Sequence, residues 1–248
     1  MNPSAADIDR ATIETWPAAT TEARDGWFYL AAGGVTGRVN AVWPLSWAGG
    51  DVERAIDDAE AWYAARNLPP RFKLTDDAFA PADLADRLAR RGYQCVMPTL
   101  IMLRDLSAPI GDHEPVGVAS AMPPAFDLAL QNSTTSADDL EERRSIARRV
   151  PAPAAFATRA QDERVVAIGA SAIAGRLAGI FLMRTVPDER RRGHALHVLR
   201  ALLHWASAHG AAHAFLQVDA DNAPAITLYA REGFARLTTY RFWRKPPR

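Results

Sequence analysis

The segment that decides the fold is Thr185-Val186-Pro187-Asp188-Glu189-Arg190-Arg191-Arg192-Gly193-His194-Ala195. It joins an apolar stretch, 177–186, predicted to be a strand, to a predicted amphipathic helix over 195–208. Free backbone N–H groups and the helix dipole attract anions to a helix start, and a glycine there lets a ligand approach closely. Arginines alongside can pair with phosphate oxygens. The segment therefore predicts a phosphate-binding junction; the alternative is a solvated basic helix start.

A second pattern follows this junction. A strand is predicted over 214–218 and a helix over 224–232, with Pro224 near the helix start and Gly233 just past its end. The residues that carry the pattern are Leu216, Gln217, Val218, Asn222, Ala225, Leu228, Tyr229, Gly233 and Phe234. One predicted helix and one predicted strand lie between the arginine-rich segment and Asn222.

Together the two patterns point to a known family. Arg190-x-x-Gly193-x-Ala195 resembles the Q/R-x-x-G-x-G/A pyrophosphate loop of the GNAT superfamily of N-acetyltransferases. The second pattern resembles that family's strand followed by Asn-x-x-Ala-x-x-Leu-Tyr and Gly-Phe. The resemblance covers residues 164–243. It implies the GNAT acyl-CoA N-acyltransferase fold, an α/β (α+β) arrangement with a mixed, mostly antiparallel sheet flanked by helices.

The resemblance also implies a site for acetyl-CoA as co-substrate. The strand 177–185 would splay from the strand 214–218, and the pantetheine arm would enter the gap. A backbone amide near Leu182 or Met183 would polarise the thioester carbonyl, as a fixed donor placed where charge develops. The implied cofactor-binding residues are Leu182, Met183, Thr185, Arg190, Arg191, Arg192, Gly193, His194, Ala195, Asn222, Ala225 and Tyr229. Asn222 could equally cap a helix.

By the same resemblance, Tyr229 would protonate the departing CoA thiolate; the alternative is a core aromatic on an amphipathic helix. Many relatives place a glutamate on the splayed strand as general base, but residues 177–185 contain no carboxylate. The amine proton would therefore have to pass to Asp219, to Asp221, to a side chain of the first half or to water. Of these we select Asp219 as the candidate base. Arg184 could face an anionic group on the acceptor.

The first half repeats the element pattern of the second. Residues 72–93 and 216–234 both run from a strand through a helix to a Gly-aromatic pair, which favours duplication over convergent capping. We expect a degenerate GNAT-like domain over 1–106 and the catalytic domain over 107–248. The helix start that would match Gly193 carries Asp51 and Glu53, whose charges would repel a pyrophosphate. The first half is thus expected to form a wall of the acceptor pocket. Trp43, Trp47 and Trp62 could line that wall, but a place in the core is the preferred interpretation of each.

Composition excludes several kinds of partner and site. The chain has 29 basic and 29 acidic residues, so no net field recruits nucleic acid or an anionic membrane. Its only cysteine, Cys95, excludes an internal disulfide and is interpreted as a core residue. The histidines lack acidic or cysteine partners at ligand spacing, so no metal site is predicted. The lack of a signal-like or membrane-spanning stretch predicts a cytoplasmic protein.

We therefore expect an N-acetyltransferase that transfers an acetyl group from acetyl-CoA to a primary amine by direct attack. The acceptor would be a small molecule or a peptide, with no nucleic-acid or membrane partner. One alternative is a transferase that uses a larger acyl-CoA. Another is a non-catalytic acyl-CoA-binding regulatory protein, which the missing strand carboxylate favours and Tyr229 and Asn222 oppose.

Overall fold

The computed structural model describes residues 2–134 and 136–246 of the 248-residue chain. The first half contains α1 (Ala5–Thr15), β1 (Thr20–Arg24), β2 (Trp27–Ala31), the short helix η1 (Gly37–Val39), β3 (Val42–Pro44), α2 (Val52–Ala64), β4 (Arg71–Thr75), α3 (Leu84–Arg90) and β5 (Gln94–Asp105). The second half contains β6 (Gly117–Ala119), α4 (Pro124–Asn132), α5 (Ala137–Ala147), β7 (Ala154–Gln161), β8 (Arg164–Ala174), β9 (Leu177–Thr185), η2 (Pro187–Glu189), α6 (His194–Ala208), β10 (His213–Asp219), α7 (Ala223–Arg231) and β11 (Ala235–Arg244).

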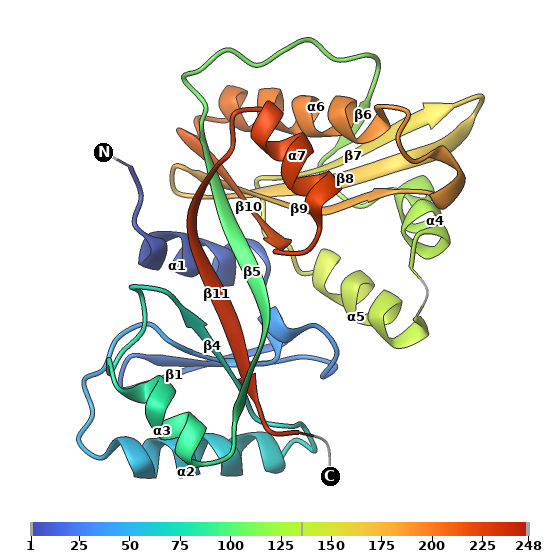
Figure 1. Cartoon of the computed structure of the whole chain (residues 1–248). Helices are drawn as coiled ribbons and strands as arrows, with labels where there is room; N and C mark the ends of the chain where they lie inside the picture. Colours follow the sequence, from blue (N-terminus) through green and yellow to red (C-terminus); the bar gives the residue numbers. More distant parts are fainter. Residues whose placement is uncertain (1, 135, 247–248) are drawn as a thin grey trace.

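All described strands form one sheet in the order β1-β2-β3-β4-β11-β5-β10-β9-β8-β7-β6. The pairs β3–β4 and β9–β10 are parallel and the other pairs are antiparallel. Helices flank both faces (Figure 1). The predicted mixed, mostly antiparallel sheet flanked by helices is therefore confirmed.

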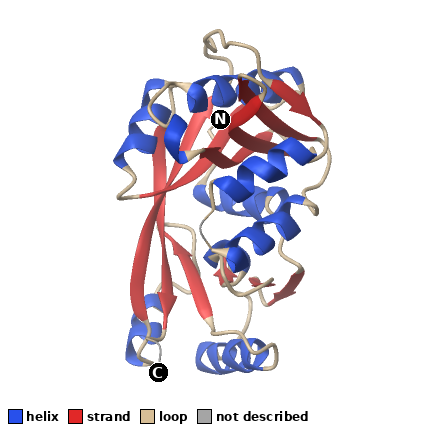
Figure 2. Ribbon diagram, turned by 90° about the vertical axis from the view of Figure 1, so that its right-hand side faces the viewer, coloured by secondary structure: helices blue, strands red, loops and turns tan. Residues whose placement is uncertain are grey.

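The last strand of each half pairs with the other half. β5 lies between β11 and β10, and β11 lies between β4 and β5. In Figure 1 these two long strands run side by side from the part covered by α6 and α7 to the part covered by α2 and α3, and Figure 2 shows the same ribbon from the side. Strands of both halves form one continuous sheet, so the structure has the form of a single domain. The division at that point stays a prediction.

The sheet of the second half is covered on both faces. On one face, α6 packs Val198, Leu199 and Leu202 against small residues of β7 and β8. On the other face lie α4 and α1, and α1 comes from the start of the chain. No helix was predicted over residues 5–15, although Ser4 and Asp7 form the capping box that begins α1. The first helix of the chain thus closes the underside of the β9–β10 region.

The first half has its own apolar cluster around α2 and α3. Trp43 and Trp62 are buried, as the core interpretation predicts, whereas Trp47 is only half-buried. The core interpretation of Cys95 is wrong: this thiol is exposed on β5. Gln94, Met97 and Pro98 at the same end of the strand are exposed as well, so this end of β5 lies outside the covered part of the sheet.

The sequence Arg38–Leu45 (RVNAVWPL) is apolar enough for a strand, but only its later part pairs in the sheet. Residues 37–39 form η1 instead, and only Val42–Pro44 pair as β3. The side chain of Asn40 causes the difference, because its Oδ1 accepts from the N–H groups of Ala32 and Gly34 and its Nδ2 donates to the carbonyl of Thr36. A side chain that satisfies a turn's backbone groups competes with strand pairing. The resulting loop carries Arg38 toward the second half.

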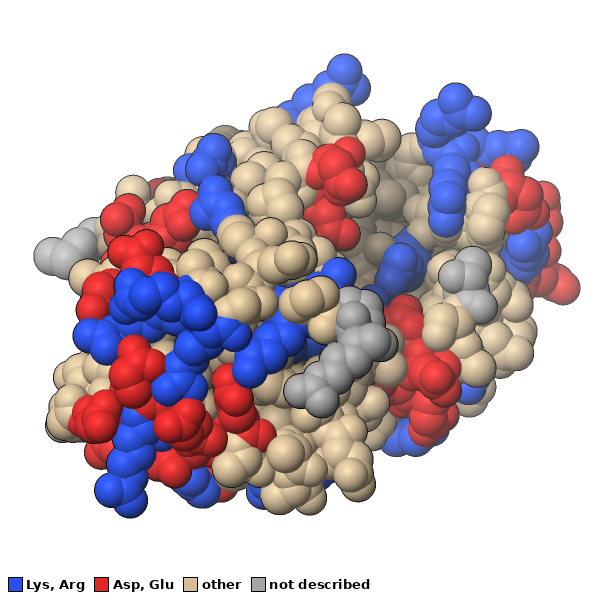
Figure 3. Space-filling model, turned by 60° about the horizontal axis from the view of Figure 1, so that its bottom comes forward, with Lys and Arg blue, Asp and Glu red and all other residues tan. Residues whose placement is uncertain are grey.

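The surface carries both signs of charge. Seen from the end that α2 and α3 cover, basic and acidic side chains are interspersed (Figure 3). None of the helices among residues 2–134 and 136–246 combines the length and apolar character needed to cross a membrane.

Candidate active site

The two central strands of the second half separate partway along their length. β9 and β10 pair from Leu177 opposite His213 to Ile180 opposite Leu216, and no further. Beyond that point a cavity of about 380 Å³ opens, lined by both strands; it is the first of two cavities and is called the inner cavity below. The predicted splay between the strands 177–185 and 214–218 is therefore present, and it leaves backbone groups of both strands free to face a ligand.

A bulge in β9 lies at the mouth of this gap. The β8–β9 register shifts between Ile168 and Ala170, and Leu182 has a φ of 54°, in the left-handed region. Opposite the bulge stands Gly169, where a Cβ would lie 2.4 Å from Sδ of Met183. The glycine thus makes room for the Met183 side chain. Leu182 and Met183 have no partner residue in either ladder, which leaves their peptide groups available to a ligand.

The arginine-rich segment forms the entrance to α6. Gly193 is the N-cap residue with a φ of 85°, and Arg191 before it has a φ of 63°. The N–H groups from Arg191 to Ala195 donate to no other group among the described residues. A Cβ at Gly193 would meet nothing within 4 Å, so the space in front of the helix start is open. A loop of free amides before an open space is the arrangement that holds phosphate oxygens.

Carboxylates in this segment are compensated locally. Asp188 pairs with Arg164 at 2.7 Å. Glu189 pairs with Arg192 at 3.1 Å and with Nε2 of His194 at 3.3 Å. The guanidinium groups of the remaining two arginines of the run, at positions 190 and 191, have no carboxylate partner among the described residues and are exposed. They stay available to an anion beside the free amides.

A second cavity of about 640 Å³ lies over this loop. It is lined by ten of the predicted cofactor-binding residues: Met183, Thr185, Arg190, Arg191, Gly193, His194, Ala195, Asn222, Ala225 and Tyr229. Leu182 and Asp219 line the first cavity, and Arg192 lines neither. The two cavities share Met183, Arg184, Asn222, Ala225 and Tyr229, so they form one passage from the helix start to the strand gap.

Tyr229 lies where the two cavities meet. It comes from α7, is 8% exposed and packs against Phe234 with ring centroids 6.0 Å apart. Its hydroxyl makes no hydrogen bond with the described residues, and burial raises its pKa to about 12. Asn222 begins α7 by accepting from the N–H of Ala225 at 3.3 Å, so the capping role is present, and the same residue lines both cavities. A protonated phenol without a partner can donate to a ligand.

The first cavity contains residues that the sequence analysis missed. Arg38 from η1, Asp139 and Arg143 from α5, and Tyr240 from β11 line it beside Asp219. These side chains come from elements far apart in the sequence, and no local motif marks any of them. Only the packing of the loop before β3 and of α5 onto the β9–β10 gap brings them together.

The histidines do not gather into a site. His194 is buried against Glu189, and Nδ1 of His209 contacts the carbonyl of Trp205 at the end of α6. Within the described ranges, no group of three or more histidine, cysteine, aspartate or glutamate side chains is placed to bind a metal ion.

Comparisons with known proteins agree with this geometry. The model of a family described as "Probable histone acetyltransferase Rv0428c C-terminal" matches residues 5–243. The chain is 26% identical over 243 residues to "Uncharacterized N-acetyltransferase YobR" of Bacillus subtilis (strain 168), covering 95% of this chain and 96% of that protein.

Solved structures share the fold. A GCN5-related N-acetyltransferase from Kribbella flavida superposes with a TM-score of 0.74 at 18% identity, over 98% of this chain and 96% of its own. A tandem GNAT protein from the clavulanic acid biosynthesis pathway superposes with a TM-score of 0.60 at 16% identity, over 100% and 91%. Since the family model spans nearly the whole chain, the protein belongs to the Rv0428c C-terminal family of GNAT N-acetyltransferases and is an acyltransferase.

Proposed function

We propose that the protein transfers the acetyl group of acetyl-CoA to a primary amine by direct attack of the amine. The observation that carries this proposal is the single passage that joins the free amides at the start of α6, the unpaired hydroxyl of Tyr229 and the gap between β9 and β10. A donor with a diphosphate at one end and a thioester at the other fits such a passage. Bound acetyl-CoA would supply the activated acetyl group.

Three groups of this chain would hold the donor. The amides from Arg191 to Ala195 would accept the diphosphate at the start of α6, with the guanidinium groups of Arg190 and Arg191 beside them. The backbone of Met183, which has no partner in either ladder, and that of Thr185 would bond the pantetheine amides along β9, and Asn222 would donate from the opposite wall. The amides from Arg191 to Ala195 have no competing partner in the described part of the chain, whereas Nε of Arg190 also donates to the carbonyl of Thr185 at 3.3 Å.

The same residues can serve the chemistry. An amide at the β9 bulge, of Leu182 or Met183, would donate to the thioester oxygen as negative charge develops there. As the amine nitrogen bonds to the carbonyl carbon, the carbon–sulfur bond breaks and Tyr229 would give its proton to the sulfur. Its raised pKa keeps the phenol protonated throughout the physiological range.

Asp219 is the candidate acceptor of the amine proton. Two aspartates line the inner cavity, but Asp139 is bound to Arg143 at 2.8 Å. Asp219 ends β10, and its carboxylate makes no hydrogen bond with the described residues. Asp221 lines neither cavity and provides a matched control. We expect Asp219→Asn to lower kcat by about 10²-fold or more and Asp221→Asn to leave it near the wild-type value. Equal effects of the two changes would reject Asp219 as the base.

The decisive experiment combines binding and turnover. Calorimetry should show that acetyl-CoA binds, and thiol release should be saturable with an amine acceptor. Tyr229→Phe should lower kcat by about 10²–10⁴-fold while acetyl-CoA affinity changes little, and Tyr93→Phe, a buried tyrosine of the first half, should change neither. Binding without turnover on any amine would instead identify a regulator. Faster turnover of propionyl- or succinyl-CoA would identify a larger acyl donor.

We further propose that the first half is a degenerate second copy that binds no CoA. The strands β1 to β5 of the first half can be matched in order with β7 to β11 of the second half. Read inward from the two edges of the sheet, the strand order is then the same in both halves, with β6 as an extra edge strand and with β5 and β11 exchanged between the halves. Gly92 and Gly233 end α3 and α7 with φ values of 81° and 82°. The residue after each glycine donates to a carbonyl five positions earlier, at 3.0 Å in both. The likeness to a tandem GNAT structure supports the same proposal.

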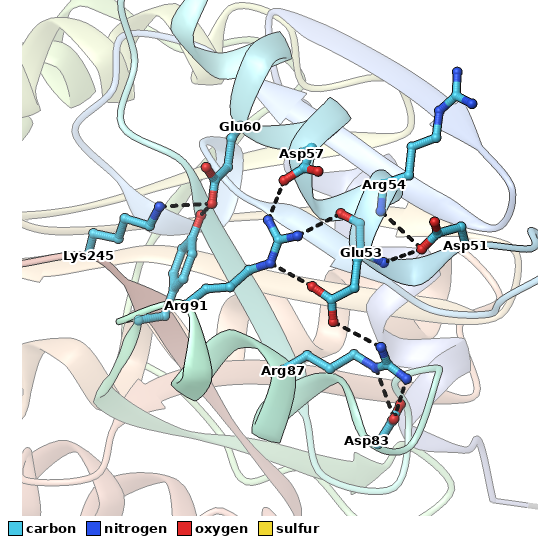
Figure 4. A network of polar contacts seen from close by, with 10 residues as sticks. Asp51, Glu53, Arg54, Asp57, Glu60, Asp83, Arg87, Arg91 and Lys245 are labelled. Atoms are coloured by element: carbon cyan, nitrogen blue, oxygen red, sulfur yellow. Dashed lines mark hydrogen bonds and ion pairs between the residues drawn. The ribbon is translucent and has the colours of Figure 1, made fainter.

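In this copy the helix start is occupied by its own side chains. Oδ1 of Asp51 accepts from the N–H of Glu53 at 2.9 Å, and Glu53 pairs with Arg87 at 2.9 Å and with Arg91 at 2.7 Å (Figure 4). These carboxylates take the place that a phosphate would need at the start of α2. Calorimetry should therefore give one acetyl-CoA per chain. A stoichiometry of two would contradict the proposal.

A further inference from the structure

Three arginines converge on the inner cavity between β9 and β10. Arg38 comes from η1 in the first half, Arg143 from α5, and Arg184 from β9. Arg143 is neutralised by Asp139, one turn earlier on the same helix, at 2.8 Å. Arg38 and Arg184 have no carboxylate partner among the described residues.

This lack of partners sets the two residues apart. Every other arginine of the described chain that is buried or half-buried donates at least one side-chain hydrogen bond, whether to a carboxylate, a carbonyl or a hydroxyl. These arginines are Arg71, Arg87, Arg91, Arg104, Arg143, Arg144, Arg149, Arg159, Arg200 and Arg241. The guanidinium groups of Arg38 and Arg184 donate none. A half-buried guanidinium carries five N–H donors, and here all of them remain open to a ligand in the cavity.

The charges around Arg38 and Arg184 also indicate a site for an anion. Burial lowers the pKa of Arg38 and of Arg184, and the charge of Arg143 lowers both further. Asp219 and Tyr240 act in the opposite direction on Arg38, and Asp139 does so on Arg184. The cavity thus concentrates positive charge that its own carboxylates only partly offset.

The loop of Arg38 and the strand of Arg184 place both groups at the cavity before any ligand arrives. The guanidinium of Arg38 lies 5.6 Å from the ring centroid of Trp16. The loop that carries it is fixed by Glu142, which accepts from residues on either side of Arg38, Thr36 and Asn40. Arg184 sits on β9 just beyond the bulge, facing both cavities. Preformed donors of this kind bind planar or tetrahedral oxyanions without further ordering.

Resting on the proposed acetyl transfer, we propose that the acceptor is a small amine that also carries an oxyanion, a carboxylate or a phosphate, which Arg38 and Arg184 bind. The cavity volume of about 380 Å³ is in the lower range of small-molecule sites. A lysine-rich tail, in contrast, would bring further positive charge to these arginines. The family description names a probable histone acetyltransferase. Because of these arginines, the inner cavity of this chain favours a different class of acceptor from a lysine-rich histone tail.

The test compares acceptors that differ only in the anion. With acetyl-CoA as donor, kcat/KM is measured for β-alanine against its amide, for phosphoethanolamine against ethanolamine, and for a histone-tail peptide. We expect at least one anionic amine to exceed its neutral match by about 10–100-fold, the range of a charged hydrogen bond. The pair with the larger ratio identifies carboxylate or phosphate. In Arg38→Gln and Arg184→Gln the ratio should fall toward one, and in Arg54→Gln, an exposed residue of α2, it should stay at the wild-type value.

The outcomes separate the two proposals. Equal rates for charged and neutral amines, or a preference for the peptide, overturn the inference while acetyl transfer stands. Absence of acetyl-CoA binding overturns the proposed function, and then the melting temperature still tests the inference. An unpaired, half-buried cation destabilises the free protein, so Arg184→Gln should raise its melting temperature by about 2–4 °C. An unchanged or lower melting temperature would show that Arg184 is structural and that no anion is missing.

Discussion

The carboxylate of Glu142 on α5 accepts a hydrogen bond of 2.8 Å from Nδ2 of Asn40, in the loop before β3. The same carboxylate accepts from the backbone N–H groups of Val35 and Thr36. Glu142 is only 5% exposed, and Gly33 leaves it room, since a Cβ there would lie 3.2 Å from Oε1. One buried carboxylate of the second half therefore fixes the loop of the first half that brings Arg38 to the inner cavity.

Glu142→Gln should weaken acceptor binding through this loop. The amide loses the charge and keeps only one accepting oxygen, so some of the loop donors go unsatisfied at a cost of about 1–3 kcal/mol. We expect the KM for the acceptor to rise about tenfold while acetyl-CoA affinity and kcat change little, as measured by steady-state kinetics and calorimetry. Glu141→Gln, next in the chain but 65% exposed, is the control. A rise in the KM for acetyl-CoA instead would place Glu142 outside this role.

Gly193 and Gly210 provide a matched pair at opposite ends of α6. Their φ values are 85° and 84°, and a Cβ at either would meet nothing within 4 Å. Alanine should therefore cost the same free energy of unfolding at both positions, about 1–2 kcal/mol, measured by urea denaturation. Only Gly193→Ala should reduce acetyl-CoA affinity, about tenfold or more, because only that backbone faces the phosphate site. If Gly210→Ala weakened binding equally, the effect would come from stability rather than from contact.

The parts of the fold that could be predicted were encoded locally. The segment 185–195 predicts the end of a strand, an anion-binding turn and the start of a helix within eleven neighbouring residues. The residues from Asn222 to Phe234 likewise predict the helix α7 from local signals. The insertion of β5 between β10 and β11 was not predictable in this way, because pairing partners more than a hundred residues apart leave no periodic signal.

The acceptor side of the site could not be predicted from the sequence for the same reason. Arg38, Glu142 and Arg184 acquire their relation only when α5 packs beside the loop before β3. The wrong core interpretation of Cys95 has a related cause, since burial along β5 depends on where that strand leaves the sheet's covered part. In contrast, the capping box of Ser4 and Asp7 is a local signal that predicts α1 and was overlooked.

A buried ion pair joins α1 to β4. Nζ of Lys73 lies 2.7 Å from Asp9, with side chains 0% and 2% exposed, and Thr75 bonds to both. Asp9→Asn should lower the free energy of unfolding by about 3–5 kcal/mol, since it leaves a buried ammonium without its counter-charge. Replacing both partners, with Asp9→Leu and Lys73→Met, should restore most of that loss. Asp7→Asn, at the exposed capping box, should cost only about 1 kcal/mol.

Thermal and urea denaturation measure these differences. If the double variant were as unstable as Asp9→Asn, the pair would be essential for packing rather than for charge balance. The same result would also show that the cation–aromatic contacts of Lys73 with Trp43 and Tyr240, at 3.9 and 4.2 Å, hold the cluster together.

Alkaline pH should unfold the protein through its tyrosines. Burial raises the pKa of Tyr29, Tyr229 and Tyr240 to about 12, whereas an unfolded phenol ionises near pH 10. Between these values the folded chain binds more protons than the unfolded chain, so the free energy of unfolding falls as pH rises. The contribution is fully present below about pH 10 and is lost toward about pH 12, up to about 2–3 kcal/mol for each residue. Urea denaturation across this range, with phenolate absorbance, measures both quantities. Tyr240→Phe should flatten the slope, and phenolates that titrate near pH 10 in the folded protein would contradict the prediction.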